Sequence, residues 1–202
     1  MTTEEINNVN KTKAALELQL ADIKKLTGIN SLLLSVCFVD TLAGFYCGYD
    51  GKTQGGNKKR YEKFVDKYLA SHKSYIYDVR CNLTHSFSNT VANFMFVDNP
   101  EFSKVFGTTV SILNSPIFNI DKFKVDLESA FNTYFNDLLN NSESNIQVNF
   151  HTRFNGFGIL QDGVIGTVRN LKGEIINHID QADTMPGLNL KIVSFDPTKI
   201  KQ

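Results

Sequence analysis

Apolar residues recur every three or four positions along much of the N-terminal half of the chain, which places them on one face of an α-helix. The pattern predicts a helix over residues 10–27 that ends at Gly28, and a second over residues 31–46 that begins after Asn30, a good N-cap residue. The second stretch is apolar nearly all round, which is typical of a buried central helix. Small residues form a stripe along one face of this helix, at Cys37, Thr41 and Gly44. We favour packing of another helix of the same chain against this stripe over contact with a second copy.

Three more helices are expected after a polar, glycine-rich loop at residues 47–59. The apolar face of the first is formed by Tyr61, Phe64, Val65 and Tyr68. The next helix covers residues 73–86, and its apolar line is Ile76, Val79 and Leu83. The last begins at Asp121, and its apolar line is Leu127, Phe131, Tyr134 or Phe135, and Leu138. The polar sequence NNSES at residues 140–144 breaks or kinks this last helix.

Between residues 88 and 119 the pattern changes to short runs of β-branched and aromatic residues, which predict a small β hairpin or meander. Beyond residue 156 the pattern is mixed: residues 188–195 alternate like a strand, and residues 173–180 fit a helix or a strand. We therefore expect a mainly α protein. Its bundle of about five helices covers residues 1–155 and contains the β-rich insert. A C-terminal extension, residues 156–202, is expected to pack on the same domain.

The composition is that of an ordinary globular protein. The 202 residues are 42% hydrophobic and 21% charged, and the chain is long enough for one sizeable core. Lysine plus arginine and aspartate plus glutamate both number 21, so the chain has no net charge that would attract nucleic acid. Binding to RNA would therefore require a local basic patch.

The cysteines, Cys37, Cys47 and Cys81, form no close pair, which favours free thiols in a reducing compartment. The first residues lack the basic and apolar regions of a signal peptide. The longest apolar stretch, residues 32–46, is short and is interrupted by polar residues, so we do not expect it to span a bilayer. A cytoplasmic protein without a membrane partner is expected. The four histidines do not occur at metal-ligand spacing, so we expect neither a bound metal nor another cofactor.

The sequence YDVRCNLTHSFS, residues 77–88, carries Arg80 and His85 five positions apart, with Asn82 between them. This spacing alone is weak evidence, but the stretch closes the helix that precedes the last predicted core helix. An Arg, an adjacent polar residue and a His about four to six positions further on, at the end of the penultimate core helix, mark the HEPN superfamily of small helical bundles. The chain resembles this superfamily.

The resemblance extends over residues 30–140. The segments VDTLAGFYCG, RYEKFVDKYL and YDVRCNLTHSF, in this order, are also similar to a group of uncharacterised bacterial proteins. Two features depart from the family pattern. Cys81 follows the arginine where the family usually has Asn, Asp or His, and the β-rich insert separates the motif from the last helix. Both departures concern the activity more than the fold.

The resemblance implies a homodimer whose two motifs face one cleft and cut RNA there without a metal, in stress response or phage defence. Such cleavage requires the 2′-hydroxyl, which DNA lacks, to attack the adjacent phosphorus. His85 would move a proton to or from the reacting oxygens, because histidine titrates near neutral pH. Arg80 would hold the phosphate, and Asn82 would orient the phosphate or His85.

On a regular α-helix Arg80 and His85 point about 140° apart. They reach one ligand only if the helix loosens between them, which Asn82 and Thr84 favour, or if two chains share the site. Asp40 is the one charged residue in the predicted central helix. Two interpretations of it are open: it orients the guanidinium of Arg80, or it lies at the edge of the bundle and bonds Tyr or Thr hydroxyls.

Other polar residues near the motif are weaker candidates. Asp78 is placed to support Asn82, four positions further along the helix. A short basic cluster follows the glycine-rich loop at Lys58, Lys59 and Arg60. It either follows a phosphate backbone or forms a solvated start of a helix, and the second interpretation is favoured. His151 and Arg153 are expected at the surface, and a second site at these residues is the less favoured alternative.

An alternative function belongs to another class of protein. The chain would be a non-catalytic helical module that binds a protein, nucleotide or RNA partner. The zero net charge and Cys81 beside the arginine favour it. It predicts that Arg80 is engaged in a salt bridge, and that His85 is buried or far from any two-fold axis.

Overall fold

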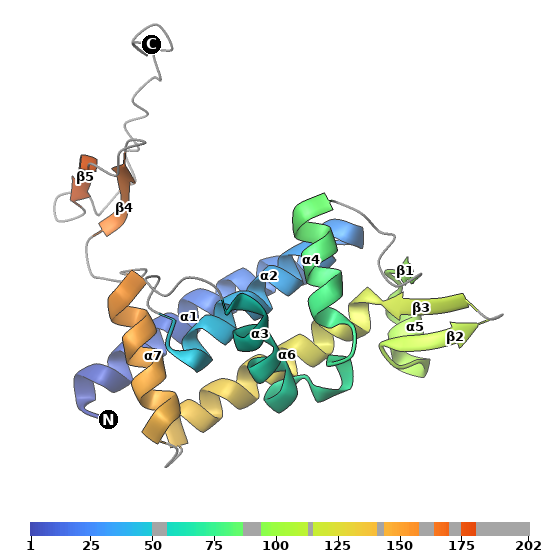
Figure 1. Cartoon of the computed structure of the whole chain (residues 1–202), viewed down its shortest axis with the longest axis horizontal. Coiled ribbons are helices and arrows are strands. Elements are labelled where there is room, and N and C mark those ends of the chain that lie inside the picture. The colour runs from blue at the N-terminus through green and yellow to red at the C-terminus, as the bar shows by residue number, and fades with distance from the viewer. Residues whose placement is uncertain are drawn as a thin grey trace, which may run out of the picture. The chain divides into compact units, whose positions relative to one another are not determined.

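The computed structural model describes residues 1–49, 56–86, 94–112, 115–140, 144–157, 164–169 and 175–180. They belong to two compact units, Met1–Ile159 and Leu160–Gln202. The first unit is mainly helical and carries a small three-stranded sheet (Figure 1). The mainly α fold expected from the sequence is therefore confirmed.

Six long helices form the body of the first unit in the part of the chain that is described. They are α1 (Thr3–Lys25), α2 (Gly28–Cys47), α3 (Asn57–Tyr68), α4 (Ile76–Ser86), α6 (Ile120–Asn140) and α7 (Ser144–Phe157). α2 contacts all of the other five (Figure 1). Four of its apolar side chains are fully buried: Leu32, Val36, Val39 and Leu42. These contacts on several sides explain why α2 is apolar nearly all round.

α2 is also long and apolar enough to cross a membrane, judged by length and composition, and no other described helix meets this criterion. The helix extends beyond residues 32–46 at both ends, so it is longer than the stretch considered in the sequence, and the absence of a membrane partner stays a prediction. A buried core helix meets the same criterion. More than half of the most apolar stretch of α2 is buried inside the unit.

The ends of α1 and α2 differ from the predicted ones. α1 begins at Thr3, because Thr2 and Glu5 form a capping box there. The hydroxyl of Thr2 accepts from the backbone N–H of Glu5 at 3.2 Å, and the Glu5 carboxylate accepts from the N–H of Thr2 at 2.6 Å. Gly28 starts α2 rather than ending α1, and Asn30 lies inside α2 instead of capping it.

The predicted apolar faces of the later helices are confirmed. The buried residues that form them are Tyr61, Phe64 and Val65 in α3, Ile76, Val79 and Leu83 in α4, and Leu127, Phe131, Phe135 and Leu138 in α6. A 3₁₀ turn, Ala70–His72, follows α3, so α4 starts later than predicted. α6 ends at Asn140 and α7 begins at Ser144, so the NNSES segment separates two helices.

The insert between α4 and α6 combines strands with a short helix: β1 (Met95–Val97), α5 (Pro100–Val105), β2 (Thr109–Ile112) and β3 (Ser115–Asn119). β2 and β3 form the expected antiparallel hairpin. β1 pairs in parallel with the other edge of β3, so the strand order is β1-β3-β2 and the sheet is not a meander. The sequence prediction missed α5, which starts with Pro100 and is capped by Asn99 through a 2.9 Å bond from the N–H of Glu101.

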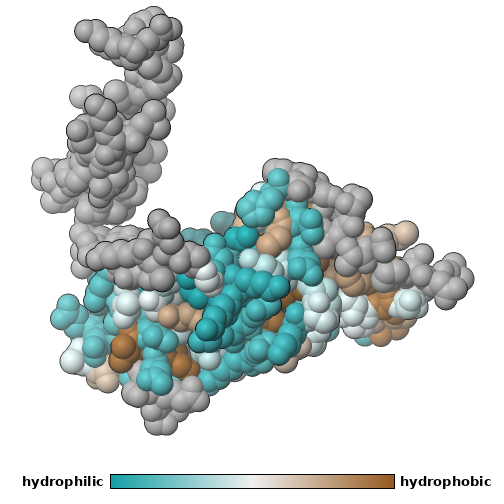
Figure 2. All heavy atoms as spheres, in the orientation of Figure 1, coloured by the Kyte–Doolittle hydropathy of each residue, from teal (hydrophilic) through white to brown (hydrophobic). Residues whose placement is uncertain are grey.

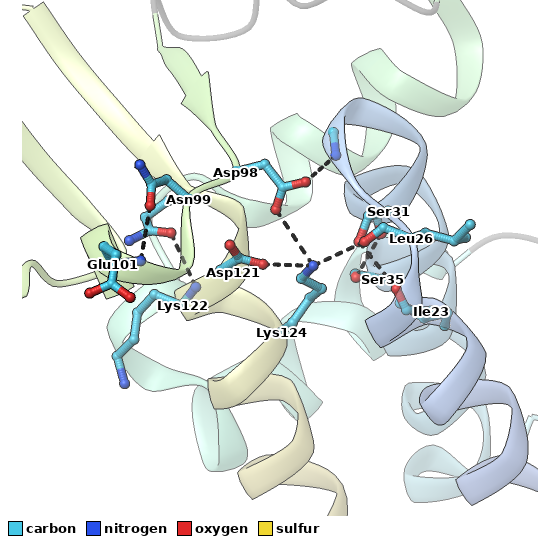
Figure 3. A network of polar contacts seen from close by, with 12 residues as sticks. Ile23, Leu26, Ser31, Ser35, Asp98, Asn99, Glu101, Asp121, Lys122 and Lys124 are labelled. Carbon is cyan, nitrogen blue, oxygen red and sulfur yellow. Dashed lines mark hydrogen bonds and ion pairs between the residues drawn. The ribbon is translucent and has the colours of Figure 1, made fainter. Parts of the chain in front are cut away.

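A buried lysine ties the insert to the helices (Figure 3). Lys124 on α6 has only 7% of its side chain exposed. Its ammonium lies 2.7 Å from a carboxylate oxygen of Asp121 and 3.5 Å from one of Asp98, and it donates to the backbone carbonyl of Leu26 at 3.1 Å. The other oxygen of Asp98 accepts from the backbone N–H of Gly28. One cation therefore joins the start of α6, the end of β1 and the turn between α1 and α2.

A second polar cluster surrounds the buried His72. Its Nε2 lies 3.1 Å from Oδ2 of Asp126, and its Nδ1 lies 2.7 Å from the hydroxyl of Tyr75. The hydroxyl of Thr108 donates to Asp126 at 2.9 Å, and the ammonium of Lys122 lies 2.8 Å from the other carboxylate oxygen. Burial disfavours the ionised carboxylate, but the hydrogen bonds from His72, Lys122 and Thr108 outweigh it and lower the pKa of Asp126 to about 2.

The second unit contains two described strands, β4 (Val164–Arg169) and β5 (Ile175–Asp180), which pair antiparallel. Of the two alternatives for residues 173–180, the strand is therefore the correct one. The strand expected at residues 188–195 lies outside the described residues. Packing of the C-terminal extension against the helices stays a prediction.

Candidate functional site

Arg80 on α4 is held by Asp40 on α2. The Nε of Arg80 donates to Oδ2 of Asp40 at 2.7 Å, and its Nη2 lies 2.6 Å from the same oxygen. The pair is partly buried, with 15% of the Arg80 side chain and 30% of the Asp40 side chain exposed. Of the two interpretations of Asp40, the structure therefore supports the one in which this carboxylate orients the guanidinium.

The ion pair and its burial determine the protonation states of Arg80 and of the nearby Tyr61. Burial disfavours the charged form of Arg80, but the hydrogen bonds and charge of Asp40 outweigh it and raise the pKa of the guanidinium. The hydroxyl of Tyr61 is buried and has no hydrogen-bond partner among the described residues. Burial raises the pKa of Tyr61 well above its ordinary value, and the negative charge of Asp40 adds to the shift. Tyr61 therefore stays a neutral phenol.

His85 lies on a different face of α4 from Arg80. The helix continues through Ser86, so the two side chains point about 140° apart. The hydroxyl of Thr84 donates to the backbone carbonyl of Arg80 at 2.8 Å, within the helix. The loosening expected at Asn82 and Thr84 does not occur. His85 is exposed, and a single copy of the chain does not bring it and Arg80 to one ligand.

Asn82 and Asp78 contact each other rather than the proposed catalytic pair. The amide of Asn82 donates to the backbone carbonyl of Asp78 at 3.0 Å, so the contact does not involve the Asp78 carboxylate. Asp78 is exposed. Within the described residues, no hydrogen bond or ion pair joins either side chain to Arg80 or His85.

The predicted basic cluster forms the first turn of α3, which begins at Asn57. Figure 2 shows hydrophilic residues gathered over the outer face of this helix. Lys59 is exposed, and the ammonium of Lys58 lies 3.8 Å from the carboxylate of Glu62 on the next turn. These two lysines therefore agree with the favoured interpretation, in which the basic cluster is the solvated start of a helix. Arg60 is less exposed than they are.

Arg60 lies over the ring of Tyr49, which follows the C-cap of α2. The carbon of its guanidinium is 3.8 Å from the ring centre, and the group also donates to the side-chain oxygen of Asn57. Arg153 on α7 approaches the same tyrosine. Its guanidinium carbon is 5.4 Å from the ring centre, and its Nη1 donates to the backbone carbonyl of Tyr49 at 3.2 Å. Two arginines from different helices therefore share one tyrosine.

A pocket of about 240 Å³ opens beside these arginines. It is lined by Asp40, Thr41, Ala43, Gly44, Tyr49, Asn57, Arg60 and Arg153. A Cβ atom on Gly44 would lie 3.2 Å from the Nε of Arg153, so the glycine makes room for the guanidinium. The small-residue stripe of α2 thus packs against α7 at this position, as favoured from the sequence. Asp40 connects the pocket with Arg80.

Arg153 is the residue that sequence reasoning missed. It was expected at the surface, but it lies half-buried against α2. No local pattern on α7 indicated this position. The one available signal was Gly44 inside an apolar helix, which indicates a close approach without identifying the residue that approaches.

The chemistry of this region suits anions. Among the described residues, no three His, Cys, Asp or Glu side chains are grouped so as to hold a metal ion. Guanidinium groups present several donors in a plane and bind phosphate and carboxylate oxygens.

No protein-family model, curated protein or solved structure matches this chain.

Proposed function

We propose that the chain is a HEPN-type helical domain that cuts RNA without a metal, at a cleft shared by two copies. The observation that carries this proposal is the ion pair of Arg80 and Asp40, which fixes a guanidinium on the helix that also presents an exposed His85. A fixed guanidinium holds phosphate oxygens and offsets the negative charge that grows in the transition state. An exposed histidine exchanges protons near neutral pH.

Two copies are part of the proposal, because Arg80 and His85 of one chain diverge by about 140°. His85 of one copy removes the proton of the 2′-hydroxyl, whose oxygen then bonds to the adjacent phosphorus. The partner's His85 protonates the 5′-oxygen as its bond to phosphorus breaks. The products are an RNA end with a 2′,3′-cyclic phosphate and an RNA end with a 5′-hydroxyl.

The test is incubation of the purified protein with structured and unstructured RNA in the presence of EDTA. We expect cleavage products that end in a cyclic phosphate. His85→Ala should slow cleavage by about 100-fold or more, since a positioned acid or base contributes roughly 10²–10⁴ to the rate. His151→Ala is the matched control, because this histidine lies on α7 beside Glu5, and it should cleave like the wild type. If the wild type cleaves no faster than His85→Ala, the protein is not this kind of enzyme.

The same ion pair also favours a second candidate function, a non-catalytic module that binds RNA, a nucleotide or a protein. Both Nε and Nη2 of Arg80 already face Asp40, which leaves fewer donors for a reacting phosphate. This candidate predicts binding without cleavage. It also predicts a dimer in which the two Arg80–His85 pairs lie more than about 20 Å apart, too far to act on one phosphate.

A further inference from the structure

A groove of about 320 Å³ lies between α1 and α2. Its apolar and small lining residues are Ile23, Leu26, Leu34, Cys37, Phe38 and Thr41. Leu26 and Leu34 belong to the exposed large apolar residues of the chain, and Ile29, between them in the sequence, is exposed as well. Exposed apolar residues that are gathered at one groove, rather than scattered singly, indicate a binding site.

The groove exposes one part of the small-residue stripe of α2. At Gly44 the stripe packs against Arg153 of α7. Thr41 and Cys37, about one and two turns earlier, line the groove instead, and both side chains are partly exposed. The hydroxyl of Thr41 donates to the backbone carbonyl of Cys37 at 3.3 Å, so it is already satisfied within the helix. This part of α2 therefore allows the close approach of another helix.

The charged side chains at the rim of the groove form ion pairs. Asp22, which also lines the groove, pairs with Lys25 at 2.8 Å between carboxylate oxygen and ammonium. On α2, Asp40 follows Cys37 by three positions and pairs with Arg80. A rim that carries both signs does not select RNA or a strongly charged peptide. It suits a copy of itself, because a carboxylate of one chain can face a cation of the other.

We propose that this groove is a dimer interface, occupied by the same groove of a second copy. The inference rests on the proposed function, because Arg80 and His85 of one chain diverge and a site built from them is incomplete without a second chain. A two-fold interface uses one surface twice, so that surface must carry both a projection and a recess. The exposed Leu34 supplies the projection, and the recess beside Ile23 and Phe38 receives it.

A two-fold axis at Cys37, perpendicular to the helices, also brings the two copies of Asp40 close together. Two packed helices lie about 8–10 Å apart. Asp40 is three residues beyond Cys37, about 4.5 Å along the helix. In the antiparallel pair the two Asp40 positions are therefore about 13 Å apart. Each Asp40 holds its Arg80, and this distance is below the limit of about 20 Å given above for two motifs that act on one phosphate.

Cross-linking of single-cysteine variants tests the interface, because a residue beside a two-fold axis meets its own counterpart. Three variants of the full chain each keep one of the cysteines and carry serine at the other two positions. All three thiols are partly buried, so the variants are matched. With oxygen and copper phenanthroline as oxidant, we expect disulfide-linked dimers of the variant that keeps Cys37. Equal cross-linking through Cys47 or Cys81, or none through Cys37, would overturn the proposal.

Sedimentation velocity measures the association itself, and we expect a dimer of the wild type. Leu34→Lys places a charge in the apolar contact and should raise the dissociation constant about 30-fold or more. Val148→Lys makes a similar change at an exposed apolar residue of α7, outside the groove, and should leave the dimer intact. Circular dichroism verifies that both variants fold. A monomeric wild type, an unchanged dimer of Leu34→Lys, or equal losses in the two variants would overturn the proposal.

These measurements contain no RNA, so they separate the interface from the proposed activity. A dimer that forms through the groove but does not cut RNA would refute the ribonuclease and leave the interface in place. Cleavage of RNA by a protein whose dimer does not involve Cys37 and Leu34 would refute the interface and leave the ribonuclease.

Discussion

Two places in the molecule hold partly or fully buried cations, and they differ in how these cations are balanced. At Lys124, one buried ammonium faces two partly buried carboxylates and a backbone carbonyl. At the pocket beside Tyr49, Arg60 and Arg153 both contact this tyrosine, and Asp40, which also lines the pocket, pairs with the partly buried Arg80.

The difference separates a cation enclosed by parts of the fold from cations that line a pocket. A buried charge is costly unless other groups of the protein compensate it. The partners of Lys124 come from the insert, from α6 and from the turn after α1, so this cation holds parts of the fold together. Arg60 and Arg153 instead line a solvent-accessible pocket.

Loss of the lysine should give the largest effect on stability. Lys124→Met removes the cation and leaves the partly buried carboxylates of Asp98 and Asp121 without it, although Asp98 keeps its hydrogen bond from the backbone N–H of Gly28. We expect the free energy of unfolding to fall by about 3–5 kcal/mol, the range measured when one member of a buried ion pair is removed. Urea unfolding followed by circular dichroism measures this change.

The control for this variant is Lys25→Met. Lys25 pairs with Asp22, and 75% of each side chain is exposed, so its loss should leave the urea midpoint unchanged. Equal effects of the two substitutions would contradict the structural role assigned to Lys124.

The cluster around His72 should give an intermediate effect, visible as a dependence on pH. Because the pKa of Asp126 is lowered to about 2 in the folded protein, its ionised form contributes stability above the pKa of the unfolded chain, and this contribution is lost as the pH falls from about 4 to about 2. Asp126 is partly exposed, so we expect a contribution of about 1–2 kcal/mol at neutral pH.

Comparison of the wild type with Asp126→Asn measures the contribution of the ionised Asp126 to the free energy of unfolding. The difference in their free energies of unfolding should be largest at neutral pH and shrink toward pH 2. A difference that stays constant between pH 7 and pH 3 would indicate that packing of the side chain, rather than its charge, is responsible.

The smallest effect on stability is expected at the pair of Asp40 and Arg80. Asp40→Asn removes the carboxylate but retains the size of the side chain, and the partly exposed Arg80 keeps access to water. We expect a loss of about 1 kcal/mol in the free energy of unfolding. Urea unfolding measures this change as well. A loss as large as that in Lys124→Met would contradict this order of effects.

The helices were largely predictable because their apolar spacing repeats over several turns. The faces through Leu16, Phe64 and Leu127 are examples, since each contains several positions that agree with one another. The start of α2 was misplaced because Asn30 is a good N-cap residue by type, whereas the observed start is at Gly28. α5 was missed because its six residues are too few to show a helical period.

The candidate site was only partly predictable for a different reason. The pair of Arg80 and Asp40 was one of two interpretations, since an isolated charge in an apolar helix requires a partner but does not identify it. The convergence of Arg60 and Arg153 joins helices that lie about 90 residues apart in the sequence. Contacts of this kind depend on how α7 packs against α2, which no local pattern encodes.

The direct junction between β3 and α6 has a mechanical consequence. β3 ends at Asn119 and α6 begins at Ile120, so the strand continues into the helix without a linker that could bend. α6 has 21 residues and acts as a rod about 30 Å long. Near its other end, Asp137 accepts a hydrogen bond at 3.0 Å from the hydroxyl of Tyr68 on α3. A force applied to the sheet would therefore be transmitted along this rod to the helix that carries Arg60.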